Sequence, residues 1–221
     1  MFDAHRGFLI EVCRPGIEGS SLPLDKIDWK QFSDMAEREG LGGFVYILLK
    51  EEKMVPLDSL DSFKDDYHTN VRTNLSCFHS LNPVVECLEG NGITSIVFRG
   101  ASLMGDVYPT FGMRGFKDVD ILIREGDLFK AIDLLKKEGF CSCDPYISVL
   151  YNKNICIDLH TDFMTYSRVK PVRLAINTDI DSVFERTRIK EVQGTRLRTL
   201  HPEDALLSLA VHLQMHSFDR L

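Results

Sequence analysis

The sequence lacks several features that would assign it to a specialised class of protein. It contains no apolar run long enough to cross a bilayer, so we expect no membrane association. The segment from Met1 to Cys13 does not show the basic-then-apolar order of a signal peptide. The six cysteines are scattered and form no C-x-x-C pair, and a chain of this size needs no disulfide framework. We therefore expect reduced thiols and a cytoplasmic protein.

Clustered positive charge is also scarce. The formal net charge is −7 at pH 7, whereas binding to a nucleic-acid backbone requires clustered Lys and Arg side chains. A long nucleic acid is therefore a poor candidate partner. The stretch 168–198 departs from this average and forms either a solvated face or a wall that faces a polyphosphate or another acidic substrate. Its basic residues are Arg168, Lys170, Arg173, Arg186, Arg188, Lys190, Arg196 and Arg198.

The remaining composition is typical of a globular protein with one sizeable domain. Of the 221 residues, 44% are hydrophobic and 27% are charged, and no repeat or low-complexity segment is present. Residues 1–92 are expected to be mainly helical. Apolar spacing and helix-ending glycines predict helices over 28–40 and 41–49, and a long amphipathic helix over 57–88 with a bend at Pro83.

Residues 93–200 differ in character and predict an α/β core. β-branched and apolar residues predict strands over 94–98, 116–123, 147–151 and 155–160, a helix over 127–139, and a hairpin of 188–192 with 196–200. A further helix begins near residue 201, so region 201–221 is the start of a C-terminal helical part, either short or truncated. The predicted fold class is α+β: a small mixed β-sheet with helical N-terminal and C-terminal flanks.

Acidic residues alternate with apolar residues in two of these strands. Side chains of a strand point to opposite faces in turn, so Asp118 and Asp120 share one face, while Val119 and Ile121 lie on the other. The later segment 155–160 repeats this arrangement around Asp158. If the two strands are neighbours, three carboxylates converge on one patch.

Such convergence requires a stabilising partner. Two like charges about 4 Å apart repel by roughly 4 kcal/mol at an effective dielectric constant of ~20. The cluster of Asp118, Asp120 and Asp158 therefore holds either protons or cations, and carboxylate oxygens suit Mg²⁺ or Mn²⁺. Two bridged ions can activate an attacking oxygen and stabilise the leaving oxygens of a phosphoryl group. A D-x-D pattern alone is weak evidence, because exposed strand edges often carry alternating acids.

A glycine turn upstream strengthens the case for phosphate chemistry. Arg99, Gly100 and Ser102 lie between a buried strand and a short helix. At such a turn, backbone N–H groups and a hydroxyl can hold phosphate oxygens. A glycine turn by itself is more often a plain connection between two elements.

In combination, these motifs resemble the polymerase-β-type nucleotidyltransferase superfamily. A longer pattern resembles its bacterial uncharacterised nucleotidyltransferase family, whose members show K-G-x-x-L, Y-P, R-x-x-x-D-x-D-x-L and D-x-H. The similarity covers about Asp28 to Leu221, and the family's lysine is Arg99 here, which keeps the charge. The superfamily's Gly-Gly or Gly-Ser pair is Gly100-Ala101. The corresponding segments are Arg99–Leu103, Tyr108-Pro109, Arg114–Leu122 and Asp158–His160.

The resemblance implies an enzyme that transfers a nucleoside monophosphate from a nucleoside triphosphate, expected to be ATP, to a hydroxyl and releases pyrophosphate. The acceptor is a small molecule, a sugar or a protein. Asp118 and Asp120 would bind two Mg²⁺ or Mn²⁺ ions, and Asp158 would bind the catalytic ion and orient the acceptor hydroxyl. Gly100 and Ser102 would hold the β and γ phosphates, with Arg99 in the same cofactor-binding group.

Other polar residues allow more than one interpretation. Arg114 is expected to neutralise phosphate charge through its forked guanidinium. His160 shares a strand face with Asp158, so it is a partner of the metal ligands, a substrate contact or a structural hydrogen-bonding group. His212 and His216 lie one helical turn apart but lack the glutamate of a zinc protease motif, which favours a plain amphipathic helix.

Two further functional hypotheses compete with the enzyme. In the first, the fold is catalytically inactive and serves as a nucleotide-sensing or protein-binding module. In the second, Asp118 and Asp120 form the D-x-D motif of a glycosyltransferase that uses a sugar nucleotide. The glycosyltransferase hypothesis leaves Asp158 and the glycine turn unexplained.

Overall fold

The computed structural model describes residues 4–14, 16, 24–50, 52, 55–164 and 179–215. It confirms the predicted α+β class, since a seven-stranded mixed sheet is combined with helices before, between and after the strands. The chain forms two compact units. One comprises residues 1–74 and the loop 108–115, and the other comprises residues 75–107 and 116–221. No helix in the described ranges is both long and apolar enough to cross a membrane.

The first unit is helical and has its own apolar core. It contains α1 (Ala4–Val12), α2 (Trp29–Arg38), α3 (Gly42–Leu49) and the N-terminal part of α4 (Leu57–Gly90). Asp28 caps α2, because its side chain accepts a hydrogen bond from the N–H of Gln31, as expected of an N-cap aspartate. The core of this unit is formed by Phe8, Leu9, Val12, Leu24, Phe32, Ala36, Leu41, Val45, Leu49, Val55 and Phe63.

Within this unit, loop 108–115 contacts the helices through glycine. A Cβ atom added to Gly43 of α3 would lie 1.9 Å from the carbonyl oxygen of Gly112. A Cβ atom on Gly112 would in turn lie 2.2 Å from the ring of Tyr67 on α4. Both distances are far shorter than any van der Waals contact between carbon and carbon or oxygen. The loop therefore requires glycine at both positions.

Asparagine side chains of α4 hold the same loop. The amide nitrogen of the fully buried Asn74 donates to the carbonyl oxygens of Phe111 and Arg114, each at 2.8 Å. Asn70, one helical turn earlier, donates to the carbonyl oxygen of Gly112 at 3.1 Å. These bonds satisfy loop carbonyls that would otherwise be costly to bury.

The substitution Gly43→Ala tests this contact. We expect it to lower the free energy of unfolding by about 1–3 kcal/mol, because the added methyl forces the backbone of loop 108–115 away from α3. Gly7→Ala in α1 is the control, since a Cβ there meets no atom within 4 Å, and a helical alanine should be neutral or stabilising by up to about 1 kcal/mol. Urea denaturation measures both. Equal stability of the two variants would contradict the close approach.

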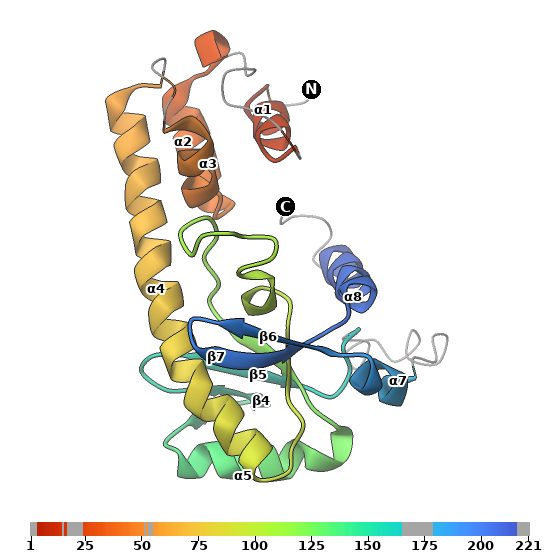
Figure 1. Ribbon diagram of the computed structural model, residues 1–221. Coiled ribbons are helices and arrows are strands. Elements are labelled where there is room, and N and C mark those ends of the chain that lie inside the picture. Colours follow the sequence, from red (N-terminus) through yellow and green to blue (C-terminus); the bar gives the residue numbers. More distant parts are fainter. Residues whose placement is uncertain are drawn as a thin grey trace. The chain divides into compact units, whose positions relative to one another are not determined.

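The second unit is built around the seven-stranded sheet, whose order is β3-β4-β5-β2-β1-β7-β6. Its strands are β1 (Ile96–Phe98), β2 (Val119–Leu122), β3 (Cys141–Cys143), β4 (Tyr146–Tyr151), β5 (Cys156–His160), β6 (Arg188–Val192) and β7 (Thr195–Thr199). The helical elements are η3 (Ala101–Leu103), η4 (Glu125–Asp127), α5 (Leu128–Lys137), α7 (Ile180–Glu185) and α8 (Pro202–Met215). In Figure 1, α5 and α8 lie on opposite sides of the sheet.

Most of the predicted elements are confirmed, with shifted ends. The expected strand 116–123 is shorter, since β2 begins at Val119 and Asp118 precedes it. The long amphipathic helix is confirmed as α4, which contains Pro83. Strand β3 and helices α1 and α7 were not predicted, because three to nine residues of mixed polarity give little periodicity.

One face of the sheet carries both an apolar core and the acidic residues. Phe98 of β1 lies opposite Asp120 of β2, and Ile96 lies opposite Leu122. Side chains two residues apart share a face, so Asp120 lies on the same face as Leu122. The apolar members of this face pack with α7, α8 and the segment after β5. This cluster consists of Ile96, Phe98, Leu122, Phe163, Met164, Val183, Phe184 and Leu200.

Candidate metal centre

The pairing of β2 with β5 brings two carboxylates together. The strands are parallel, with Asp120 opposite Asp158 and Leu122 opposite His160. Neighbouring strands lie about 4.8 Å apart, so side chains at matched positions on one face are in direct reach of each other. The two strands with alternating acids are therefore neighbours, as the convergence hypothesis required.

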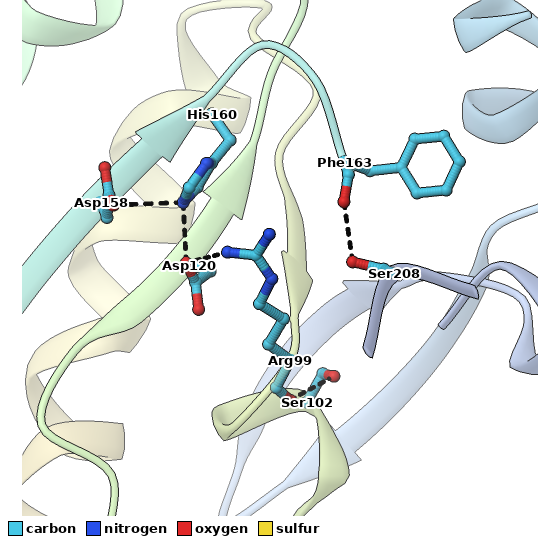
Figure 2. Close-up of polar contacts among 7 residues, drawn as sticks. All are labelled: Arg99, Ser102, Asp120, Asp158, His160, Phe163 and Ser208. Carbon is cyan, nitrogen blue, oxygen red and sulfur yellow. Dashed lines mark hydrogen bonds and ion pairs between the residues drawn. The ribbon is translucent and has the colours of Figure 1, made fainter. Parts of the chain in front are cut away.

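His160 bridges these two carboxylates. Its Nε2 atom lies 2.7 Å from Oδ1 of Asp120 and 3.3 Å from Oδ2 of Asp158. Figure 2 shows the imidazole of β5 reaching over to the aspartate of β2. Asp120, Asp158 and His160 each offer one ligand atom, and these three atoms lie within 4.8 Å of one another. The group is compact enough to hold a metal ion.

Arg99 supplies a second positive partner from the end of β1. Its guanidinium donates to Oδ1 of Asp120 at 2.9 Å, and only 5% of the side chain is exposed. Arg99 has a φ of 57°, a left-handed conformation that is uncommon for a residue with a side chain. Phe98 contacts both groups, since its ring centre lies 4.6 Å from Cζ of Arg99 and 5.2 Å from the ring centre of His160.

These contacts shift the pKa values of the paired groups in opposite directions. Burial acts to raise the pKa of Asp120, but the hydrogen bond from His160 and the charge of Arg99 outweigh it and hold that pKa below its ordinary value. Burial acts to lower the pKa of His160, but its hydrogen bonds to Asp120 and Asp158 outweigh burial and raise it. The charged forms of both groups are therefore stabilised.

Asp118 lies at the exposed rim of the centre, just before β2. Burial by the neighbouring protein raises the pKa of its carboxyl, and the charges of Asp120 and Asp158 raise it further. All three predicted carboxylates therefore interact electrostatically. The compact group of possible ligands nevertheless contains His160 and not Asp118. Of the three roles expected for His160, its hydrogen bonds fit that of a partner of the carboxylates.

The glycine turn follows Arg99 and has an asymmetric pattern of hydrogen bonds. Its carbonyl groups accept hydrogen bonds. The hydroxyl of Ser102 donates to the carbonyl of Arg99 at 2.8 Å, and the N–H of Leu103 donates to the carbonyl of Gly100. In contrast, the N–H groups of Gly100, Ala101 and Ser102 donate no hydrogen bond within the described ranges. Three successive unbonded N–H groups suit an anionic ligand. A Cβ on Gly100 would lie 3.3 Å from Cβ of Phe116, so the turn is also closely packed.

The remaining sequence candidates have different outcomes. Arg114 belongs to the first unit, where its Cζ lies 6.0 Å from the Tyr108 ring centre, and its expected phosphate contact stays a prediction. His212 lies on α8, the helix expected there, and its charge acts to lower the pKa of Asp120. His216 lies outside the described residues.

The described basic residues of the stretch 168–198 have different partners. Arg186 makes a bidentate ion pair with Asp204 of α8, at 2.7 and 2.5 Å. Lys190 is largely buried and binds the end of η3 and the loop after it. This contact could not be predicted from local patterns, because its partners lie more than eighty residues earlier in the chain. Arg168, Lys170 and Arg173 lie outside the described residues.

Paired carboxylates on neighbouring strands, next to a turn with unbonded N–H groups, define a centre suited to a cation and an anionic ligand. The chain belongs to the family described as uncharacterised nucleotidyltransferase, whose family model matches residues 25–221. This match confirms the family that the motifs indicated. No curated protein and no solved structure matches the chain.

Cys77 of α4 provides a test of the packing beside this centre. Burial, followed by the charges of Asp118 and Cys156, raises the pKa of its thiol to about 12. At pH 8 the thiolate fraction is therefore only about one in ten thousand, and thiolate is the reactive form. We expect iodoacetamide to modify the exposed Cys141 and to leave Cys77 unmodified, as measured by peptide mass spectrometry.

The same shift predicts a loss of stability in alkali. The unfolded thiol ionises near pH 8.5, so between about pH 8.5 and 12 the unfolded chain has lost this proton while the folded chain retains it. The contribution of Cys77 to stability should fall as the pH rises through that window, and Cys77→Ala should lessen the fall. Alkylation of Cys77 and Cys141 at similar rates in native protein would contradict the burial.

Proposed function

We propose that the protein is a metal-dependent nucleotidyltransferase that transfers a nucleoside monophosphate from a nucleoside triphosphate to the hydroxyl of an acceptor. In this reaction the acceptor oxygen forms a bond to the α phosphorus, the bond from that phosphorus to the bridging oxygen breaks, and pyrophosphate leaves. The observation that carries the proposal is the in-register pairing of Asp120 with Asp158. Membership of the family supports the reaction class.

The donor set fits a hard divalent cation. Carboxylate oxygens are the protein ligands that Mg²⁺ and Mn²⁺ prefer, whereas imidazole suits softer ions such as Zn²⁺. The described contacts of Asp120 with Arg99 and His160 all fall on Oδ1, so Oδ2 is the oxygen it can offer to a cation. We therefore assign Asp120 and Asp158 as ligands, with Asp118 as a further ligand at the rim. His160 fits best as the group that orients these carboxylates.

The neighbouring residues would bind the phosphates of the donor and the hydroxyl of the acceptor. The unbonded N–H groups of Gly100, Ala101 and Ser102 would hold the β and γ phosphates of ATP, the expected donor. When bound, Mg²⁺ or Mn²⁺ would reduce the negative charge that the phosphates present to an attacking oxygen. Asp158 would orient the acceptor hydroxyl, and Arg114 would neutralise phosphate charge. The acceptor itself is a small molecule, a sugar or a protein.

A thermal shift experiment tests the site. At ~100 times its dissociation constant, a ligand adds about 2.7 kcal/mol of stability, which corresponds to roughly 5–10 °C in Tm for a protein of this size. Mg²⁺ with ATP should raise the Tm of the wild type, whereas Asp118→Asn, Asp120→Asn and Asp158→Asn should each abolish the rise. Asp133→Asn, on an exposed position of α5, is the matched control and should keep it. An unchanged rise in the three site variants would exclude these carboxylates as ligands.

A second candidate function has its own support. Arg99 and His160 both contact Oδ1 of Asp120, so this carboxylate is paired with groups of the protein itself, as a nucleotide-sensing or protein-binding module without a cation would require. Release of pyrophosphate from ATP in the presence of candidate acceptors distinguishes the two. The enzyme predicts release that Asp120→Asn abolishes, whereas the module predicts binding of ATP without turnover.

A further inference from the structure

Lys190 of β6 is a charged side chain with an unusual set of partners. Only 15% of its side chain is exposed. Its Nζ atom donates to the carbonyl oxygen of Ser102 at 2.6 Å, to that of Met104 at 2.8 Å and to Oδ2 of Asp106 at 2.8 Å. An ammonium group has three donors, so these three partners satisfy it completely.

All three partners belong to one short segment, the end of the glycine turn and the residues after it. Two of them are backbone carbonyls, so the lysine restrains the backbone conformation of this segment. A peptide plane carries its C=O and the following N–H in opposite directions, so fixing the carbonyl of Ser102 also fixes the N–H of Leu103. That N–H donates to the carbonyl of Gly100 at 3.2 Å, and the Gly100 carbonyl shares a peptide plane with the N–H of Ala101. The lysine therefore acts on the N–H groups of the turn through this chain of hydrogen bonds. At the other end of the turn, the hydroxyl of Ser102 holds the carbonyl of Arg99.

Lys190 binds the carbonyl groups of the turn that no nearby donor binds. The carbonyls of residues 99, 100, 101 and 103 accept hydrogen bonds from nearby donors in residues 102–107. The two that remain between residues 99 and 104 are those of Ser102 and Met104, and both bind Lys190. Every carbonyl of this segment is therefore held by an internal donor or by the lysine. The N–H groups at the start of the turn are the backbone groups still available to a ligand.

We infer that Lys190 is a positioning residue for nucleotide binding, which orients the Gly100–Ser102 turn toward the β and γ phosphates by fixing the carbonyls of Ser102 and Met104. The identity of the ligand rests on the proposed function. The positioning role rests on the hydrogen bonds of Lys190. Asp106 is the minor partner, since 71% of its side chain is exposed and such ion pairs are weak. The carbonyl bonds, which are charge-assisted and largely shielded from water, carry the effect.

The test compares Lys190→Met, which keeps the aliphatic stem, with Arg188→Met. Arg188 is an exposed cation two positions earlier on the same strand, so the two variants lose the same charge. We would measure binding of a non-hydrolysable ATP analogue and of AMP, both with Mg²⁺. For Lys190→Met the Kd of the ATP analogue should rise about tenfold, equivalent to ~1.4 kcal/mol, while the Kd of AMP stays within about twofold. AMP lacks the phosphates that the turn would hold, and Arg188→Met should change neither value.

Amide hydrogen exchange reports on the turn without any ligand. Lys190→Met should accelerate exchange in residues 99–107, and Arg188→Met should not. If Lys190→Met does not fold, Lys190→Arg serves instead. It keeps the charge but spreads its donors over a larger planar group, so a smaller rise in the Kd of the ATP analogue, about threefold, is expected.

The outcomes separate the inference from the proposed function. A wild type that binds no ATP analogue overturns the proposed function, and the positioning role with it, whatever the exchange measurement shows. A wild type that binds, with an equal loss for the ATP analogue and AMP in Lys190→Met, makes Lys190 a general stabiliser and overturns the positioning role alone. Unchanged binding in Lys190→Met and in Lys190→Arg overturns it as well.

Discussion

The placement of two negative charges side by side is the constraint on which the second unit depends. The register of β2 and β5 places the side chains of Asp120 and Asp158 next to each other, because they occupy matched positions on the same face of neighbouring strands. Like charges at about 4 Å repel by several kcal/mol in a partly buried setting, so the fold must supply compensation. It does so with His160 two residues along β5 and with Arg99 at the end of β1.

This compensation depends in turn on the apolar face around it. Phe98 contacts both Arg99 and His160, and it belongs to the cluster that α7 and α8 cover. The hydroxyl of Ser208 on α8 donates to the carbonyl of Phe163 at 2.7 Å, which ties the segment after β5 to that helix (Figure 2). Burial strengthens each ion pair by excluding water, and it would also make an unpaired carboxylate costly. The centre and its core are therefore stable only together.

The turn after β1 is held in part by a residue that is distant in the chain. Its carbonyls are bonded internally or by Lys190, and three of its N–H groups remain for a ligand. In the first unit, α4 provides an analogous support, since Asn74 holds the carbonyls of loop 108–115 that precede and include Arg114. In both cases a largely buried donor fixes the direction of the main chain beside a residue that the motifs highlight. The division of the chain into regions 1–92, 93–200 and 201–221 stays a prediction.

The fold class, most elements, the family and the two strands that carry Asp120 and Asp158 were predictable from the amino-acid sequence. These follow from periodicity and from motifs, which are local properties of the chain. The sequence did not determine that His160 bridges the carboxylates, that Arg99 binds Asp120 or that His212 influences it. These pairings, and the contact of Lys190 with the turn, became visible in the folded chain, because each depends on strand order and on side-chain direction across segments far apart in the sequence. Charge patterning along a sequence shows that such groups are present, but packing selects which of them meet.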